Sequence, residues 1–508
     1  MKISLLCVEF APSIGLRMIH QGLLEKGHDA KLIHIPLQRV DEREIGAIAL
    51  ELVKFCKEDG LIGISCMTNT FLPVGSLAKK LKRKLKVPIV LGGIHPTFKP
   101  EECIELADYV CVGEGEEAIL ELATKVENGQ RTDNIQNIWK KEGEKIIKNN
   151  SRPLVIDLDL LPLPSFDLSR LYGVAKGKIV CVKKSKSASK KFFPFFYSII
   201  TSRGCPFKCR YCGQNALFKN NPQNALLRRR SHENILKELR LAKKLLGNNF
   251  VVSFTDDDFG VRSEKDLEDF FKKYSEEIGL PFFCAGRPLS MTEKKIRIMV
   301  DAGLKRLQIG IQTINDKVNK EIYNRPTSKE QIINFIKMAS KYHSRVEFCY
   351  DVLLDTPWEE DSTRLETLSF FLKIPKPYTL WLYSVTLYPG SDFYDKAKKE
   401  GLIIDEKKEV YNKSFLALEN SYVNSLFILF GKFGIPPFVI RKLISLRNFY
   451  FMKSLLKNST YFLLHLHFYL DGFRNSIRQR DIWLLVYYLT SPLRVILNSF
   501  KIKKRASV

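Results

Sequence analysis

The 508-residue sequence has few acidic residues and no long uninterrupted apolar stretch. Asp and Glu number 56 against 81 Lys and Arg, which leaves a formal net charge of +25. No window holds the roughly 18 consecutive apolar residues that a membrane-spanning helix needs. The opening MKISLLCVEFAP meets Glu9 too soon for the apolar core of a signal peptide. We therefore expect no membrane span, and the charge points either to an anionic partner or to a solvated lysine surface.

Cysteine is also sparse, at 11 residues in 508. This density excludes the disulfide-rich scaffolds of small secreted proteins. We therefore expect a cytoplasmic, reducing environment, in which cysteines serve as metal ligands or as buried apolar side chains. Apolar residues make up 45% and charged residues 27% of the chain, which is ordinary for a globular protein with a large core.

Residues 1–130 alternate short apolar runs with amphipathic helical patterns. This alternation predicts a doubly wound parallel sheet of the Rossmann-like α/β class, in which ligands bind at the carboxyl ends of the strands. Three of these ends carry polar or glycine-rich segments that allow close backbone approach. The expected strands are Lys2–Val8, Ala30–Ile35, Gly60–Ser65, Val87–Leu91 and Asp108–Val112, and the expected helices are Gly15–Lys26, Glu44–Lys57 and Leu72–Leu85.

The second half of the chain begins with a connector, expected over residues 131–197, that contains a proline-spaced stretch and a lysine- and serine-rich run. From residue 198 to residue 401 the strand–helix rhythm resumes. Six consecutive units predict a partial (β/α)6 barrel, whose active site forms at the carboxyl ends of its strands. The expected strands are Ser198–Ser202, Phe250–Thr255, Phe282–Ala285, Arg306–Ile311, Arg345–Leu353 and Thr379–Thr386.

Three cysteines, Cys205, Cys209 and Cys212, follow the first expected barrel strand, with spacings of four and three residues. Thiolates are the usual ligands of iron–sulfur clusters, which normally have four of them. A cubane held by three cysteines leaves one iron open to a substrate or a cofactor. The alternatives are a zinc site or scattered core cysteines, but zinc prefers four ligands, commonly in two pairs, and no second pair follows.

At this loop the chain resembles the radical S-adenosylmethionine (radical SAM) superfamily. The resemblance is carried by the C-x-x-x-C-x-x-C spacing and by the aromatic Tyr211 before the last cysteine, and it covers about residues 198–400. It implies a 4Fe–4S cluster whose open iron chelates the amino and carboxyl groups of S-adenosylmethionine. It also implies that the reduced cluster breaks the sulfonium bond and releases a 5′-deoxyadenosyl radical. The electrons would come from an external donor such as flavodoxin or ferredoxin.

Further barrel positions match the superfamily more loosely. Asp256 and Asp257 stand where a Gly-Gly-Glu-like segment contacts the methionine amino group, although acidic residues also suit a helix N-terminus. Arg287, beyond the third strand, would pair with the methionine carboxylate; otherwise it is a plain surface arginine. Gln312 falls where the superfamily often has a glutamate beside the cofactor. With Tyr211, these residues are the implied contacts of S-adenosylmethionine.

The amino-terminal region resembles the cobalamin-binding domain that precedes the barrel in one large radical SAM subgroup. The matching segments are Pro12-x-x-Gly15-Leu16, Gly63-Ile64-Ser65, Gly92-Gly93-x-His95-Pro96 and Gly113-Glu114-Gly115-Glu116. The Asp-x-His-x-x-Gly motif, whose histidine ligates cobalt, is absent, so the resemblance implies a lower corrin face without a histidine ligand. The implied cobalamin contacts are Gly15, Ser65, Thr68, Gly92, Gly93, His95, Gly113 and Glu114.

Two other interpretations of this domain stay open. It could have the same fold and bind a nucleotide or nothing, although no G-x-G-x-x-G follows the first strand. It could also be the amino-terminal domain of a radical methylthiotransferase, which holds a second cluster on three cysteines, here Cys7, Cys56 and Cys66. The Gly-Gly-x-His-Pro and Gly-Glu-Gly-Glu segments do not belong to that family.

Residues 402–508 are expected to form a basic, mainly helical region. From residue 415 onward the chain holds 14 Lys and Arg against three Asp and Glu. Its aromatic residues lie among leucines in helix-like runs, unlike the exposed sheet aromatics of nucleic-acid binders. Peripheral contact with an anionic membrane, a helical cap and nucleic-acid binding all stay open, and the last is the least favoured. The segments concerned are Tyr461–Leu470, Trp483–Leu489 and Lys501–Arg505.

These resemblances together predict a radical SAM enzyme that is a cobalamin-dependent methyltransferase. Its target would be an unactivated carbon or phosphorus centre of a small-molecule or lipid-like substrate. One S-adenosylmethionine would methylate the cobalt, and a second would generate the radical. The alternatives are a cobalamin-dependent radical cyclase or oxidase, a radical methylthiotransferase and a non-catalytic metal-binding protein that binds RNA.

Overall fold

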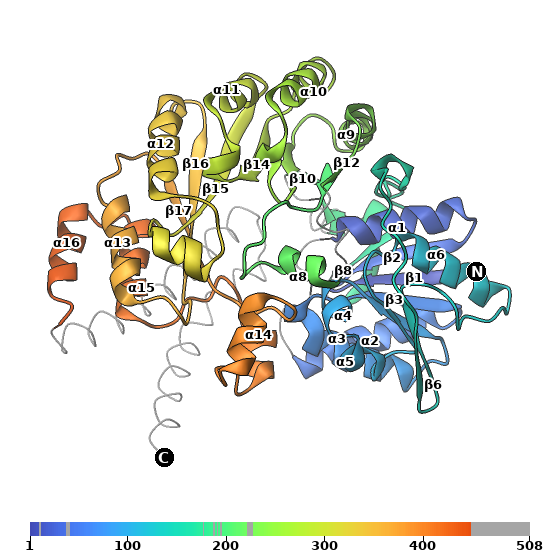
Figure 1. The fold of residues 1–508 in the computed structure, drawn as a ribbon. Coiled ribbons are helices and arrows are strands. Elements are labelled where there is room, and N and C mark those ends of the chain that lie inside the picture. Colours follow the sequence, from blue (N-terminus) through green and yellow to red (C-terminus); the bar gives the residue numbers. More distant parts are fainter. Residues whose placement is uncertain are drawn as a thin grey trace. The chain divides into compact units, whose positions relative to one another are not determined.

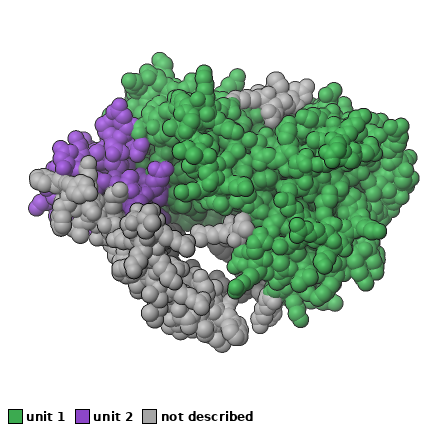
Figure 2. Space-filling model, turned by 90° about the horizontal axis from the view of Figure 1, so that it is seen from below, with its two compact units in different colours: residues 1–359, 375–417 green, residues 360–374, 418–508 purple. Residues whose placement is uncertain are grey.

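The computed structural model describes residues 1–9, 12–36, 41–175, 177–185, 188–189, 192–193, 196–220 and 227–448. The chain divides into two compact units, which Figure 2 colours separately. The first comprises Met1–Glu359 and Pro375–Ala417, and the second comprises Glu360–Ile374 and Leu418–Val508. The segments Tyr461–Leu470, Trp483–Leu489 and Lys501–Arg505 lie outside the described residues.

The amino-terminal part of the first unit is built on a nine-stranded sheet. Its strands are β1 Lys2–Cys7, β2 Asp29–His34, β3 Leu61–Ser65, β4 Ile89–Gly92, β5 Tyr109–Cys111, β6 Ile138–Glu142, β7 Lys145–Lys148, β8 Leu171–Ala175 and β9 Lys178–Cys181. They follow the order β7-β6-β5-β4-β3-β1-β2-β8-β9. The six neighbouring strands in the middle of the sheet run parallel to one another, and they are β5, β4, β3, β1, β2 and β8. The prediction of a doubly wound parallel sheet is confirmed.

Helices cover both faces of this sheet (Figure 1). They are α1 Ile14–Glu25, α2 Glu42–Cys56, α3 Phe71–Lys82, α4 Ile94–Phe98, α5 Pro100–Ile104 and α6 Glu116–Glu127. Helices α1 and α6 pack together on one face, and α2 packs against α3 on the other. Helix α2 begins where the Asp41 side chain accepts hydrogen bonds from the backbone of Arg43 and Glu44, at 2.9 and 3.1 Å. Such caps satisfy backbone donors that the first helical turn leaves unpaired.

Strands β6 to β9 come from residues 131–197, which were expected to be only a connector. Strands β6 and β7 read IWKKE and KIIK, which lack the continuous apolar runs of buried parallel strands. Strand β6 pairs antiparallel with β5 and with β7, and β9 pairs antiparallel with β8. Strands β7 and β9 are the two edges of the sheet, and an edge strand buries little side-chain surface, so its sequence carries little signal. The sheet therefore extends well beyond residue 130.

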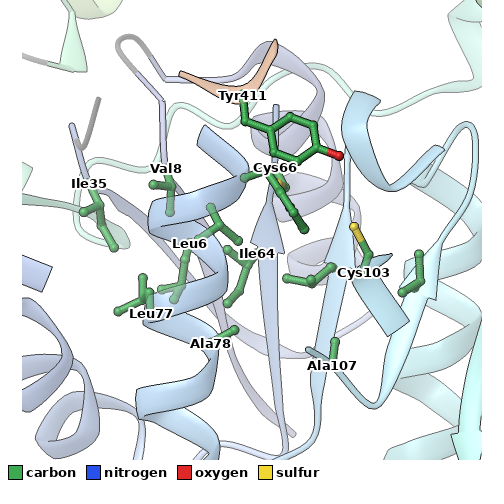
Figure 3. Close-up of a cluster of buried hydrophobic side chains, with 14 of the residues drawn as sticks. Leu6, Val8, Ile35, Ile64, Cys66, Leu77, Ala78, Cys103, Ala107 and Tyr411 are labelled. Carbon is green, nitrogen blue, oxygen red and sulfur yellow. The ribbon is translucent and has the colours of Figure 1, made fainter. Parts of the chain in front are cut away.

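A hydrophobic cluster lies between the sheet and α3 (Figure 3). Leu6 and Ile64 from the strands meet Leu77 and Ala78 from the helix, and all four are almost fully buried. Burial of one such leucine or isoleucine side chain contributes roughly 1.5–3 kcal/mol. Tyr411 belongs to the same cluster. Residues 402–508 were expected to form a separate carboxyl-terminal region, but its start packs into the core of the amino-terminal sheet through Tyr411.

The second sheet of the first unit has six parallel strands in sequential order. They are β10 Phe196–Ile199, β13 Val251–Phe254, β14 Phe282–Gly286, β15 Leu304–Gln312, β16 Glu347–Leu354 and β17 Thr379–Ser384. The helices of this part are α8 Gly213–Asn220, α9 His232–Leu246, α10 Glu264–Glu277, α11 Glu293–Asp301, α12 Lys329–Ala339 and α14 Asp392–Lys399. All six expected strands are present, which confirms the partial barrel. A separate antiparallel ribbon joins β11 Ser202–Arg203 to β12 Arg228–Arg229.

The described part of the second unit consists of helices α13 Asp361–Phe371, α15 Tyr422–Gly431 and α16 Pro437–Ser445. Arg441 donates to the Leu372 carbonyl at 3.0 Å, and the Tyr422 hydroxyl donates to the Leu443 carbonyl at 2.6 Å. In the described part of the region expected to be helical, the last helix ends at Ser445. Among the described residues, no helix combines the length and apolar character needed to cross a membrane.

Candidate active site

A cavity of about 420 Å³ lies between the carboxyl ends of the two sheets of the first unit. The loops after β1, β3, β4 and β5 form one wall. The β11–β12 ribbon, the start of the cysteine loop, α8 and the end of β13 form the other. Because parallel sheets bind ligands at these ends, both expected cofactor sites open onto one space. The lining residues include Gly15, Ser65, Gly92, Gly93, Gly113, Glu114, Glu116, Arg203, Gly204, Arg228 and Asp257.

The cysteine loop follows β11 through Gly204, whose φ of +95° favours glycine. Cys205 and Cys209 are buried, Cys212 is half-buried, and all three are free thiols. The Cys212 amide donates to the Cys209 carbonyl at 3.1 Å, so the loop turns back on itself. Three thiols on one compact loop fit an iron–sulfur cluster.

Burial raises the pKa of Cys205 and of Cys212 to about 11. At neutral pH, thiols with such pKa values become thiolates only when a metal stabilises their negative charge. Among the residues that the structure describes, no three His, Cys, Asp or Glu side chains converge on one metal ion. A cubane does not need such convergence, because each of its thiolates binds a different iron. Cys7, Cys56 and Cys66, the three cysteines of the methylthiotransferase alternative, are buried free thiols.

Arg287 lies directly against the cysteine loop. Its guanidinium carbon is 3.4 Å from the centre of the Phe207 ring, and its Nε donates to Asp258 at 3.0 Å. The side chain is buried, and its Nη1 has no hydrogen-bond partner. An unpaired guanidinium N–H beside a cluster loop suits a carboxylate ligand, which is what the sequence predicts for this residue.

The two neighbouring aspartates after β13 have different surroundings. Asp256 accepts hydrogen bonds from the Thr201 hydroxyl at 2.8 Å and from the Ser202 hydroxyl, so its carboxylate ties β13 to the end of β10. Asp257 lines the cavity. The surrounding protein, with the charge of Asp256, raises the pKa of Asp257 to about 6. Of the two, the structure places only Asp257 where a ligand in the cavity could meet it.

Tyr211 and Gln312 both lie near Arg325, a residue that the sequence did not single out. Arg325 donates to the Tyr211 hydroxyl at 3.3 Å and to the carbonyl of Gly310. Gln312 ends β15 with a φ of +68°, which non-glycine residues rarely adopt, and its Oε1 is buried without a partner. Asp355 has a φ of +61° just beyond the next strand. Such strain often marks functional strand ends.

Inside the barrel, sequence reasoning missed a second polar group. Asp351 on β16 accepts two hydrogen bonds from Gln308 Nε2 on β15, at 2.9 and 3.1 Å. Gln308 also reaches the Tyr383 hydroxyl on β17, at 3.4 Å. Burial raises the pKa of Asp351 to about 7. The sequence does show that Gln308 and Asp351 are polar residues within predicted strands. It does not show that these two strands are neighbours, so it could not predict that the two side chains meet.

Glycines shape the amino-terminal wall. A Cβ atom at Gly93, whose φ is +108°, would lie 2.9 Å from the Cys66 carbonyl oxygen, which is closer than real Cβ atoms come. Gly113 also has a positive φ, of +90°. The wall is otherwise mainly apolar, and none of the residues that line the cavity is a histidine. A smooth apolar wall with exposed backbone fits a corrin ring whose lower face takes no histidine.

Three expected cobalamin contacts have other partners. His95 and Thr68 do not line the cavity: His95 is fully buried, its Nδ1 is 3.3 Å from the Thr68 hydroxyl, and its ring packs on Phe71 and Tyr411. Burial lowers the pKa of His95 to about 4, so the ring is neutral. Glu114 lines the cavity, but its carboxylate pairs with two arginines of the barrel.

Two family models match the chain. The model of the B12 binding domain matches residues 6–123, and the model of the radical SAM superfamily matches residues 199–371. The chain is a radical SAM protein with a B12-binding domain. This radical SAM enzyme therefore uses a 4Fe–4S cluster, S-adenosylmethionine and cobalamin as cofactors.

Known proteins resemble this radical SAM enzyme along most of its length. It is 26% identical to the "Uncharacterized methyltransferase PH0819" of Pyrococcus horikoshii, over 77% of this chain and 80% of that protein. It is 24% identical to the anaerobic magnesium-protoporphyrin IX monomethyl ester cyclase of Synechocystis, over 80% and 78%. Its fold resembles the radical S-adenosylmethionine methyltransferase TsrM of Kitasatospora setae, with a TM-score of 0.61, 15% identity and coverage of 79% and 77%.

Proposed function

We propose that this protein is a cobalamin-dependent radical SAM methyltransferase that acts on an unactivated carbon or phosphorus centre. The observation that carries this proposal is the single cavity onto which the B12-binding domain and the cysteine loop both open. When bound there, the cofactors would supply a transferable methyl group and a substrate radical. Only a shared cavity lets both act on one substrate atom.

The barrel residues would bind the cluster and S-adenosylmethionine. Cys205, Cys209 and Cys212 would ligate three irons and leave the fourth free, because their loop carries no other thiol. The unpaired Nη1 of Arg287 would bind the methionine carboxylate, as the sequence predicts. Asp257, with a pKa of about 6, would accept a hydrogen bond from the methionine ammonium group in its ionised form.

Further barrel residues support that site. Gln312 has a buried Oε1 that remains available as an acceptor, and Tyr211 is held by Arg325 beside the last cysteine. Asp256 would act through the backbone, because its carboxylate holds Thr201 and Ser202 at the start of the cysteine loop. These groups would orient S-adenosylmethionine and keep water away from its sulfonium centre.

The amino-terminal wall would bind cobalamin through shape and backbone groups. Gly92 and Gly93 let the chain pass close to the ligand, and Gly15, Ser65 and Gly113 line the same wall. None of the described residues that line this wall is a histidine. A small-molecule or lipid-like substrate would enter between this wall and the cysteine loop. An external reductant such as flavodoxin or ferredoxin would supply the electrons.

Relatives named as methyltransferases support methyl transfer, and the relative named as a ring cyclase supports the second candidate, cobalamin-dependent ring closure. Methyl-labelled S-adenosylmethionine distinguishes them. Protein reconstituted anaerobically with iron, sulfide and hydroxocobalamin would be supplied with dithionite, the labelled cofactor and fractionated metabolite extract. Label in a new product supports the methyltransferase. Formation of 5′-deoxyadenosine with an altered but unlabelled product would overturn methyl transfer in favour of ring closure.

A further inference from the structure

Four charged side chains form a largely buried ion-pair cluster where the B12-binding domain meets the barrel. Glu114 comes from the loop between β5 and α6, Glu116 begins α6, and Arg203 and Arg228 come from the β11–β12 ribbon. Arg203 pairs with Glu114 at 3.0 Å and also with Glu116. Arg228 pairs with Glu114 at 2.6 Å and donates to the Val155 carbonyl at 2.8 Å. We call these four residues the interdomain ion-pair cluster.

The interdomain ion-pair cluster carries no net charge. It has two positive and two negative charges, and the exposed fractions of the side chains lie between 5% and 23%. Burial alone would raise the pKa of Glu114, but the hydrogen bonds and charges of Arg228 and Arg203 lower it instead. Both oxygens of Glu114 accept hydrogen bonds from these arginines. A ligand in the cavity would thus meet a carboxylate that is already satisfied.

The place of these residues in the chain suggests what the interdomain ion-pair cluster does. Arg203 is separated from Cys205 only by Gly204, so its position sets where the cysteine loop begins. Glu114 lies next to Gly113 on the amino-terminal wall, and all four charged residues line the cavity. A displacement of either loop would break these partly buried ion pairs and leave charges such as that of Arg228, which is buried, without a partner, which is unfavourable. The two loops are therefore expected to take up their cofactor-binding positions together.

We propose that the interdomain ion-pair cluster couples cobalamin binding to assembly of the iron–sulfur cluster, with Glu114 and Glu116 as positioning residues rather than cobalamin contacts. This inference rests on the proposed function, because it needs both cofactors in the cavity. It predicts that the chain binds hydroxocobalamin more tightly when the cysteine loop holds its cluster. By reciprocity, cobalamin raises the retention of iron by the same factor.

The test compares hydroxocobalamin dissociation constants of full-length protein with and without the iron–sulfur cluster. The cluster-free form is the variant Cys205→Ala/Cys209→Ala/Cys212→Ala. The otherwise native protein should bind about tenfold more tightly with its cluster than without, within the usual range of such couplings. In Glu114→Gln and in Arg203→Gln this ratio should fall to about 1–2. Arg203→Lys, which keeps the charge, should retain part of it.

Glu121→Gln is the matched control. Glu121 lies on α6, as Glu116 does, and pairs with Arg152 at 2.7 Å without touching the β11–β12 ribbon. It should keep the full ratio. Circular dichroism establishes that each variant is folded, and Glu116→Gln replaces any variant that is not.

Three results would overturn the inference: a ratio of 1 in the native protein, a full ratio in Glu114→Gln, or an equal loss of affinity in this variant with and without the cluster. The last result would make Glu114 a direct cobalamin contact. A second readout is the electron paramagnetic resonance signal of the reduced cluster, which cobalamin should shift in the native protein but not in Arg203→Gln. Failure of the proposed function looks different, because the native protein would then take up no iron or no cobalamin.

Discussion

The B12-binding wall of the cavity and the barrel satisfy their polar groups in different ways. On the B12-binding wall, glycines expose backbone, Glu114 is fully paired and none of the described residues that line the cavity is a histidine. In the barrel, at positions that do not themselves line the cavity, buried polar atoms of Arg287 and Gln312 have no partner, and Gln312 is held at a positive φ. The wall thus suits recognition of a large rigid ligand by shape. The barrel keeps unpaired groups that suit a small polar ligand, at a cost in stability.

The largest expected effect comes from the cysteine loop itself. Replacing Cys205, Cys209 and Cys212 together by alanine should remove the roughly four irons per chain. It should also lower 5′-deoxyadenosine formation by about 100-fold or more. Iron analysis and liquid chromatography measure these quantities. Cys284→Ala and Cys349→Ala, which remove buried barrel cysteines outside the loop, serve as controls and should keep the iron. Deoxyadenosine formation at the native rate by the triple variant would refute the assignment of the cluster.

The shape of the B12-binding wall is tested at Gly93, with a glycine outside the cavity as the control. Gly93→Ala forces a Cβ against the Cys66 carbonyl and a side chain into a φ of +108°, so hydroxocobalamin affinity should fall about tenfold. Gly46 lies on α2 and does not line the cavity, and a Cβ there would meet nothing within 4 Å, so Gly46→Ala should bind normally. Equilibrium dialysis measures both affinities. Equal affinities of the two variants would show that backbone shape at Gly93 is not what this wall recognises.

The unpaired polar groups of the barrel are tested at Arg287. Arg287→Gln should weaken S-adenosylmethionine binding about tenfold, since hydrogen bonds to charged groups contribute roughly 1.5–3 kcal/mol. The double variant Arg287→Gln/Asp258→Asn removes the buried charge left on Asp258, so folding recovers while binding does not. Arg306→Gln, at a pair with Glu347 near the start of the strands, is the control. Isothermal titration with the cluster-loaded protein measures the affinity. Native affinity in Arg287→Gln would contradict the assigned role.

The smallest expected effect concerns the barrel interior. Burial raises the pKa of Asp351 in the folded protein from the ordinary value of 3.8 to about 7, so the folded protein loses stability as the pH rises from about 3.8 to about 7, and the full loss persists at higher pH. Below about pH 3 the carboxyl is protonated in both states and has no such effect. Asp351→Asn should therefore match the native protein at low pH and exceed its unfolding free energy by about 1 kcal/mol or more at pH 8. Urea unfolding at both pH values measures the difference.

Glu347→Gln should behave in the opposite way. Burial acts to raise the pKa of Glu347, but the Arg306 hydrogen bond and charge lower it, so ionised Glu347 stabilises the folded protein above its ordinary pKa of 4.5. The variant should lose stability at pH 8, and this loss should shrink as the pH falls below 4.5 through the lowered pKa of the folded protein. If Asp351→Asn were less stable than the native protein at pH 8, the raised pKa of Asp351 would be wrong.

Much of the fold was predictable because strong local patterns specify it. Continuous apolar strands such as β1 and β3 must be buried on both faces, and their alternation with amphipathic helices leaves few topologies. The cysteine spacing was similarly local. Strands β6 to β9, at and next to the edges of the sheet, escaped prediction because their sequences are short and all but β8 contain charged residues, as loops do. The contribution of Tyr411 to the amino-terminal core escaped as well, since nothing near it in sequence points to a partner more than 300 residues away.

What the sequence determined by itself is the sheet and barrel architecture, the thiol loop and the glycine-rich strand ends, since each depends on residues close together in the chain. The tertiary structure alone decided which polar groups stay unpaired. The Arg287 guanidinium lies over the Phe207 ring, and Asp256 accepts hydrogen bonds from Thr201 and Ser202. Glu114 forms ion pairs with Arg203 and Arg228. Hydrogen-bond and charge partners are chosen by distance in space, and a one-dimensional pattern does not contain that distance.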